Sequence, residues 1–196
     1  MYIKAENPES LIDGIQTHQI INFYFAINHL KNVYRKGWLL SGITLESCES
    51  VAEHSFGVAI LAMVLAPSWS ITLDLHKVVE MALIHDIGEI YTGDIVPQDN
   101  IDPALKIELE KEAIRNVFKK LKLGDAYTLL WEEYHSSASP EAKFVKQLDK
   151  LEMALQGKVY ELLHRKNLTE FFRSVENQIE DPGLRSILES LKTINQ

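Results

Sequence analysis

The chain is poor in cysteine and in basic residues. A single cysteine, Cys48, excludes an intramolecular disulfide and a zinc site built from several thiolates, and it suits a reducing compartment. Lys and Arg total 20 against 28 Asp and Glu, for a net charge of −8. This balance argues against binding to nucleic acid or to an anionic membrane, since both usually require a basic face. A small anionic substrate stays open, because a few cations or a bound metal can invert the field locally.

Long apolar segments are also scarce. The first ten residues, MYIKAENPES, lack the apolar centre of a secretion signal. The longest apolar run, residues 58–67, is too short to span a bilayer. We therefore expect a cytoplasmic protein with no membrane partner. Its 196 residues, 46% of them hydrophobic, are enough to bury one core, and we expect a single domain over residues 1–196.

The alternating pattern of β-strands is missing too, and the helical period recurs almost throughout. Helices are expected at about residues 17–34, 50–66, 74–86, 103–123, 125–135, 140–165, 168–179 and 183–193. Gly37 is expected to break the pattern after the first helix, and Gly124 to end the helix that Asp102-Pro103 opens. Residues 87–101 are expected to form a loop. The prediction is an all-α bundle of about seven to nine helices.

What the chain does have is a dense group of reactive residues in MALIHDIGEIYTGD, residues 81–94. His85 and Asp86 lie together at the end of an apolar helix. His54 falls on an apolar stripe, so its side chain points into the core. Taken alone, His54 can be an ordinary core histidine and His85-Asp86 a chance pair.

Asp149 borders the apolar sector of its long helix, where an unpaired carboxylate is costly to bury. It can be a metal ligand or an ion-pair partner of Lys146 or Lys150. Glu152 lies closer to the apolar centre, and one interpretation is a hydrogen bond to a ligand histidine. Two imidazoles and two carboxylates suit a borderline divalent ion, with positions left open for water and substrate.

Four segments, in this order, resemble the HD-domain metal-dependent phosphohydrolases, and among them the 5′-deoxynucleotidases. They are LKNVYRKGW (30–38), ESVAEHSF (49–56), HDIGEIYTGD (85–94) and EAKFVKQLDKLEMALQ (141–156). The resemblance covers about residues 15–165 and leaves the C-terminal helices of 166–196 outside. It implies an HD-domain helical fold, hydrolysis of (deoxy)ribonucleoside 5′-monophosphates to nucleoside and phosphate, and a homodimer.

The resemblance also implies a set of site residues. The metal ligands are His54, His85, Asp86 and Asp149. They would hold one divalent ion, Mn²⁺ or Co²⁺, with Fe²⁺, Ni²⁺, Zn²⁺ and Mg²⁺ as alternatives.

Arg35 is implied as the phosphate contact and Trp38 as a sugar contact, although Lys36 and Gly37 separate two residues that are adjacent in bacterial relatives. Gly37 would let the Trp38 indole close against the C2′ edge of the sugar. A charge in solvent after a helix is the alternative for Arg35.

Glu89 and Asp94 are implied as catalytic residues, with Asp94 also on the sugar side of the pocket. Glu89, three residues after Asp86, can handle a proton, and the alternative is an exposed loop acid. Gly93 suits a positive φ, so a sharp turn can aim Asp94 at the pocket.

Two other functions remain open. One is another HD phosphohydrolase: a dNTP or pyrophosphate hydrolase, which the scarcity of basic residues disfavours, or a cyclic phosphodiesterase, which the single ligand set disfavours. The other is a non-enzymatic helical nucleotide-binding protein, which a missing ligand would favour.

Overall fold

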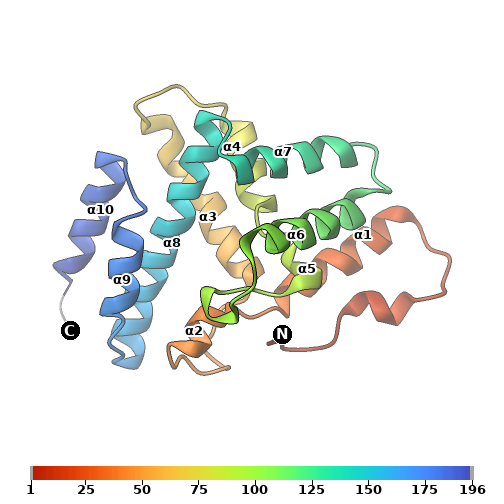
Figure 1. Ribbon diagram of the computed structural model, residues 1–196, viewed down its shortest axis with the longest axis horizontal. Coiled ribbons are helices and arrows are strands. Elements are labelled where there is room, and N and C mark those ends of the chain that lie inside the picture. The colour runs from red at the N-terminus through yellow and green to blue at the C-terminus, as the bar shows by residue number, and fades with distance from the viewer. Residues whose placement is uncertain (1, 195–196) are drawn as a thin grey trace.

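A computed structural model describes residues 2–194, and over these residues the protein is a bundle of helices without a sheet (Figure 1). Eight longer α-helices fall within the predicted number, and two short ones, α2 and α5, are added. The α-helices are α1 (Gln19–Asn28), α2 (Lys36–Leu40), α3 (Val51–Leu65), α4 (Leu75–Ile84), α5 (Glu89–Thr92), α6 (Pro103–Phe118), α7 (Gly124–Ser136), α8 (Pro140–His164), α9 (Thr169–Glu176) and α10 (Pro182–Lys192). Short 3-10 helices are η1 (Pro8–Ile12), η2 (His29–Lys31), η3 (Ala66–Ser68) and η4 (Pro97–Asp99).

Local capping signals set several of the helix starts. Ser50 and Glu53 form a capping box at the start of α3, which satisfies backbone N–H groups that have no partner within the helix. Asp74, Asp102 and Ser139 each accept a backbone N–H at the start of α4, α6 and α8. The starts of these helices lie within one residue of those predicted, because such capping residues act through short-range hydrogen bonds.

Three predicted boundaries were wrong. Gly37 lies inside α2 and does not break the chain there. The helix that begins at Pro103 ends at Phe118, and Gly124 opens α7. A Cβ on Gly124 would collide with the carbonyl oxygen of Phe118, so this glycine permits a close approach of two backbones. The expected loop over residues 87–101 contains α5 and η4.

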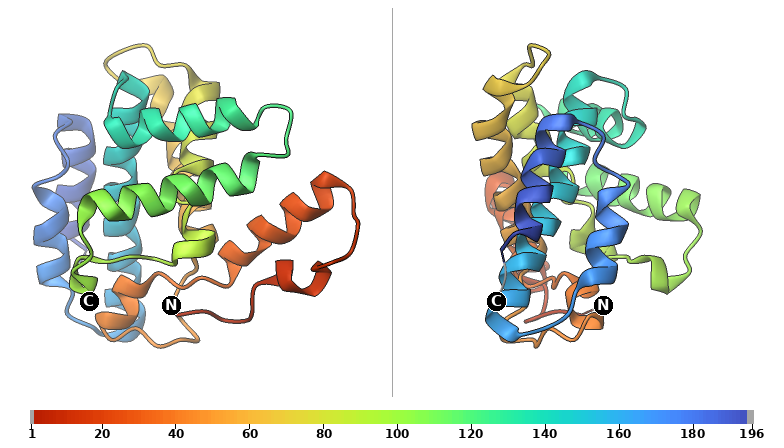
Figure 2. Two further views of the ribbon diagram at one scale, coloured as in Figure 1. Left: turned by 45° about the vertical axis from the view of Figure 1, so that its right-hand side comes forward. Right: turned by 90° about the vertical axis from the view of Figure 1, so that its left-hand side faces the viewer.

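Helix α8 is the centre of the bundle. Helices α3, α4 and α7 pack against it, and α9 and α10 lie along its other side (Figures 1 and 2). Its buried residues Phe144, Leu148 and Leu151 join Val58 of α3 and Met81 of α4 in one apolar cluster. A second apolar cluster, around Trp131 and Ile114, includes Ile84 at the C-terminal end of α4. The buried polar residues near that end of α4 lie between the two apolar clusters.

One segment differs from the expectation about membranes. By length and composition alone, Val51–Ser68 is apolar enough to cross a bilayer, with a mean hydropathy of 1.5 over 18 residues. Core helices of soluble proteins pass the same test, and this segment buries Val58 and Ala62 in the apolar cluster. Its other face exposes Phe56, Ile60, Met63 and Val64.

Candidate metal centre

The four predicted ligands meet at one place in the bundle. His54 lies in the first turn of α3, His85 caps the end of α4, Asp86 follows it, and Asp149 lies midway along α8. The ligand atoms of His54, His85 and Asp149 lie within 4.8 Å of one another. Asp86 completes the set, because its Oδ2 lies 3.8 Å from Nε2 of His54 and 3.3 Å from Nε2 of His85.

Each histidine presents its Nε2 atom to the centre and uses Nδ1 elsewhere. His85 Nδ1 lies 2.8 Å from the carbonyl oxygen of Ala82; a carbonyl only accepts, so Nδ1 carries the proton. His54 Nδ1 lies 2.5 Å from Glu152 Oε2. Both Nε2 atoms are buried without a hydrogen-bond partner in the described residues. Such atoms, aimed at two carboxylates, fit a divalent cation well.

The charges around His54 and Asp86 also favour a bound cation. Burial and Arg35 lower the pKa of His54, but Asp149 and Glu152 outweigh them and raise it to about 9. Burial raises the pKa of Asp86, yet His85 and Arg35 hold it below its usual range. The surroundings therefore favour positive charge at Nε2 of His54, and a metal ion bound there would displace a proton.

Asp149 forms one of the ion pairs that the sequence left open, with Lys150, and its other oxygen faces the predicted ligands. Its Oδ1 lies 3.1 Å from Nε2 of His54, while its Oδ2 lies 2.9 Å from Nζ of Lys150. Burial raises its pKa, but Lys150 and His54 keep it well below the usual range. Asp149 thus remains ionised, as a metal ligand must be.

Glu152 forms the hydrogen bond to a histidine that was one interpretation of its position in the sequence. It lies one turn beyond Asp149 on α8, is buried, and bonds His54 as described above. Gly57 of α3 makes room for it, since a Cβ there would lie 2.7 Å from Glu152 Oε1. The close approach of α3 and α8 therefore fixes the orientation of the His54 ring.

Gly57→Ala is expected to weaken metal binding about 10- to 100-fold, the usual cost of disturbing a hydrogen-bond partner of a ligand histidine. The added methyl must displace the Glu152 carboxylate. Titration calorimetry with Mn²⁺ measures the effect. Gly37→Ala is the matched control, because a Cβ there meets only Val96, at 3.9 Å. Equal affinities of the Gly57→Ala protein and the control would contradict this role of Glu152.

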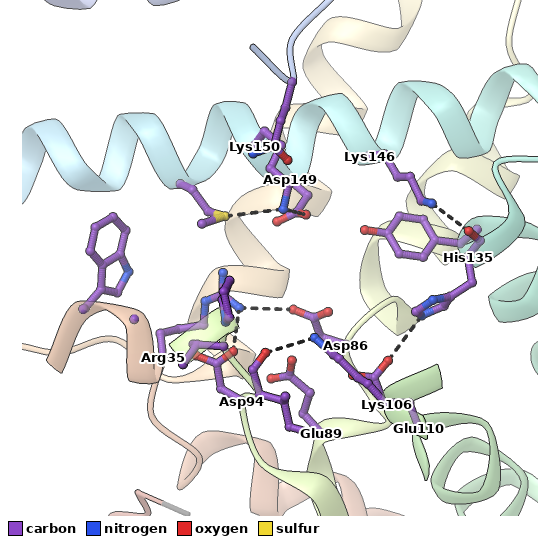
Figure 3. A pocket seen from close by; sticks show the side chains of 18 of the residues that line it. Arg35, Asp86, Glu89, Asp94, Lys106, Glu110, His135, Lys146, Asp149 and Lys150 are labelled. Carbon is purple, nitrogen blue, oxygen red and sulfur yellow. Dashed lines mark hydrogen bonds and ion pairs between the residues drawn. The ribbon is translucent and has the colours of Figure 1, made fainter. Parts of the chain in front are cut away.

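Arg35, the predicted phosphate contact, and Asp94, predicted for the sugar side, meet beside the ligands (Figure 3). Nη1 of Arg35 lies 3.6 Å from Asp86 and 3.5 Å from Asp94, and its side chain is only 11% exposed. The alternative of a charge in solvent is therefore wrong. Burial disfavours the charge, but these carboxylates raise the pKa of Arg35 further above its ordinary value.

The turn that was expected before Asp94 is present. Gly93 has φ +72°, and Asp94 Oδ2 then accepts the backbone N–H of Lys36 at 2.5 Å. This bond ties the loop after α5 to the start of α2. It therefore holds Arg35, the N-cap of α2, close to Asp94.

Glu89 is buried and lines the cavity that Arg35, Asp86 and Asp94 also line. The interpretation of Glu89 as an exposed loop acid is therefore wrong. Burial, together with the negative charges of Asp86 and Asp94, raises its pKa well above the ordinary value. Its Oε2 has no hydrogen-bond partner among the described residues. Glu89 therefore keeps its proton to a higher pH than an ordinary glutamate does.

Trp38 lines this cavity. The Trp38 indole was expected to move on a flexible Gly37, and in the structure it is held in place. The ring is 2% exposed, and its Nε1 donates to Glu49 Oε1 at 2.7 Å. Tyr160 and Phe171 pack on it at 5.2 and 4.3 Å between ring centroids. Because α2 continues through Gly37, Trp38 is a fixed wall and not a flap.

The cavity around these residues has a volume of about 580 Å³, within the range of small-molecule sites. Several of its residues were missed from the sequence. They are Lys106, Glu110 and Lys146, beside His135, on one side (Figure 3), and Met153, Phe171 and Gln178 on another. His135 belongs to the run at residues 132–135, for which both a helix edge in solvent and the mouth of the site were open. Neither group stands out locally, because its residues come from two or more elements among α6, α7, α8, α9 and the turn after α9, and only the packing brings them together.

Comparisons with known proteins agree with this geometry. A family model described as an HD domain matches residues 27–189. The chain is 37% identical to 5′-deoxynucleotidase HDDC2 of Danio rerio over 88% of this chain and 86% of that protein. It is 35% identical to 5′-deoxynucleotidase HDDC2 of Homo sapiens, over 96% and 92%. A solved structure of a conserved hypothetical protein from Pyrococcus furiosus superposes with a TM-score of 0.74 at 32% identity, covering 89% of this chain and 99% of the other.

Proposed function

The chain belongs to the HD-domain family, and from this premise we propose that it is a metal-dependent 5′-nucleotidase acting on deoxyribonucleoside 5′-monophosphates. The proposal is carried by the Nε2 atoms of His54 and His85, which lie beside Asp86, Asp149 and Arg35 and have no hydrogen-bond partner in the part of the chain that the structure describes. The similar proteins from Danio rerio and Homo sapiens bear the name 5′-deoxynucleotidase. An enzyme of this family uses a divalent metal, and for this chain we propose Mn²⁺ or Co²⁺, which accept mixed imidazole and carboxylate ligands.

His54, His85, Asp86 and Asp149 would hold the ion, which supplies an acidified water and polarises a phosphoryl oxygen. The remaining work falls to the chain itself. Arg35 offers a planar fork of donors to the phosphate, and its present partners, Asp86 and Asp94, hold it at the ligands.

Glu89 provides the proton that the reaction needs. Breaking the P–O bond leaves an alkoxide at the 5′-oxygen of the nucleoside, which must be protonated to leave. The carboxyl of Glu89 is suited to donate it, because burial raises its pKa and its Oε2 has no hydrogen-bond partner among residues 2–194. This assigns Glu89 to chemistry and Arg35 to substrate binding.

The sugar is expected between Asp94 and Trp38. Both line the cavity next to Arg35, and the carboxylate of Asp94 can accept a hydrogen bond from the 3′-hydroxyl. The fixed Trp38 ring leaves no polar group to bond a 2′-hydroxyl, since its N–H is used by Glu49. We therefore propose a preference for deoxyribose over ribose.

Phosphate release from a panel of nucleotides tests the proposed function. We expect turnover of dAMP faster than of AMP, of 5′-phosphates faster than of 3′-phosphates, and little release from dATP or cyclic AMP. Faster release from dATP or cyclic AMP would instead favour another HD phosphohydrolase. If the protein bound nucleotides but released no phosphate with any divalent metal, the alternative of a non-enzymatic nucleotide-binding protein would be favoured.

The exposed apolar residues of α3 support a homodimer. Phe56 and Val64 are 64% and 60% exposed, with Ile60 and Met63 between them on the same helix. Clusters of this kind on a soluble protein mark contact surfaces, and we propose that a second copy of the chain covers them.

Phe56→Glu with Val64→Glu should halve the mass in light scattering to that of one 22.4 kDa chain. Leu163→Glu, an equally exposed site on α8, is the control; a monomeric unmodified protein contradicts the proposal.

A further inference from the structure

The cavity has two unlike parts. Around the ligands its residues are charged, whereas on the side formed by α8 and α9 it is lined by Met153, Phe171 and Gln178. The metal and the phosphate need neither an aromatic ring nor an amide there. Phe171 and Gln178 also lie outside the four motifs that carry the catalytic residues. This part of the cavity therefore calls for a different role.

Phe171 offers a rigid aromatic surface. Its ring centroid lies 4.3 Å from that of Trp38, with the two planes at 42°. It packs against the buried cluster that contains Trp38, Tyr160 and Leu168, yet it still lines the cavity. Since the ring is held from behind, it loses little freedom when a planar ligand stacks on it.

Gln178 offers a hydrogen-bond acceptor at the rim. Its Nε2 donates to the carbonyl oxygen of Ser174 at 2.7 Å, which identifies the other atom as the amide oxygen because a carbonyl cannot donate. Within residues 2–194, no group donates to that oxygen. The next residue, Ile179, is fully buried, so the segment that carries Gln178 is anchored to the core.

We propose that this side of the cavity, Phe171 with Met153 and Gln178, binds the nucleobase of the substrate. The base stacks on the Phe171 ring beside the Met153 thioether, and an N–H group of the base donates to Oε1 of Gln178. Stacking on an aromatic ring tolerates any base, and every base has an N–H group, so broad base acceptance follows. The inference rests on the proposed nucleotidase activity and assigns α9, which lies outside the four motifs, a part in it.

A comparison of dAMP with 2-deoxyribose 5-phosphate isolates the base. The two substrates share the phosphate and the sugar, and only dAMP can reach the proposed wall. Phe171→Leu retains an apolar side chain behind Trp38 but removes the aromatic face. It should lower kcat/KM for dAMP about tenfold relative to that for 2-deoxyribose 5-phosphate, as the loss of a stacking partner does, because any loosening of Trp38 acts on both substrates alike. Gln178→Ala, at an exposed position, should act on dAMP alone in the same direction.

Phe172→Leu is the matched control. It removes the same ring one residue further along α9, where Phe172 faces Lys158 and a separate cavity. Both substrates should be turned over by this variant as by the unmodified protein. The inference is wrong if Phe171→Leu slows both substrates equally, or if Phe172→Leu has the same selective effect.

Binding of 2′-deoxyadenosine, which has no phosphate, separates this inference from the proposed function. Calorimetry should show weaker binding to the Phe171→Leu and Gln178→Ala proteins than to the Phe172→Leu protein, whether or not any nucleotide is hydrolysed. If the unmodified protein hydrolyses no nucleotide, the proposed function fails while this comparison still stands. Equal binding of 2′-deoxyadenosine by all three variants would overturn only the proposed binding of the nucleobase by Phe171 and Gln178.

Discussion

Asp149→Ala is expected to abolish metal binding and to lower phosphate release by at least about 10³-fold. A bound metal supplies several kcal/mol of transition-state stabilisation, and each 1.36 kcal/mol is tenfold in rate. Asp149 is the only predicted ligand from α8, and its Oδ1 lies 3.1 Å from Nε2 of His54. Without it, the α8 side of the centre has no ligand atom. Metal content of the purified variant, measured by mass spectrometry, gives the result directly.

A second carboxylate on the same helix serves as the control. Glu141 pairs with Lys77 at 3.4 Å, away from the cavity, so Glu141→Ala should keep both metal and activity. Circular dichroism should show that both variants remain helical. Full metal content in the Asp149→Ala protein would remove this residue from the site and leave only its ion pair with Lys150.

Glu89→Gln is expected to lower kcat about 10²-fold or more while the metal is retained, as for the loss of a proton-transfer group. The amide has the shape of the acid but no acidic proton. Arg35→Ala should instead raise KM as well, because it removes a charged contact to the phosphate. If both variants lost the metal equally, the division between chemistry and binding would be wrong.

The pH dependence of kcat gives an independent test of Glu89. Burial and two neighbouring carboxylates raise its pKa, so its proton-donating form persists to higher pH than for an ordinary glutamate. As pH rises through this pKa, the donor is lost and kcat should fall. Glu89→Gln has no such group, and its remaining activity should lack that alkaline decline. A decline of the same size in both proteins would assign it to another group.

The sequence was sufficient for the eight longer helices and for naming candidate ligands that the fold brings together, because both depend on short-range signals. Capping residues such as Ser50 and Asp74 act within one turn, and the ligands lie in compact motifs. Gly37 and Gly124 were misjudged because their roles depend on packing: one continues α2, and the other meets the backbone at Phe118. A local pattern does not contain such contacts.

The rest of the site was hidden for the same reason. Glu152 could be found in part, since its place on the apolar sector of α8 required a partner. The restraint on Trp38 comes from Glu49, Tyr160 and Phe171, which only the fold brings together. Gln178 lies in the turn after α9, and nothing in its neighbours indicates that it reaches the cavity.

Phosphate release from dAMP, followed as metal is added back to chelator-treated protein, tests the central claim most directly. The account predicts no release without metal and a rise that ends at one equivalent of Mn²⁺ or Co²⁺ per chain, because one set of His54, His85, Asp86 and Asp149 holds one ion. Release that continues undiminished in the metal-free protein, or that never appears with any divalent metal, would contradict it.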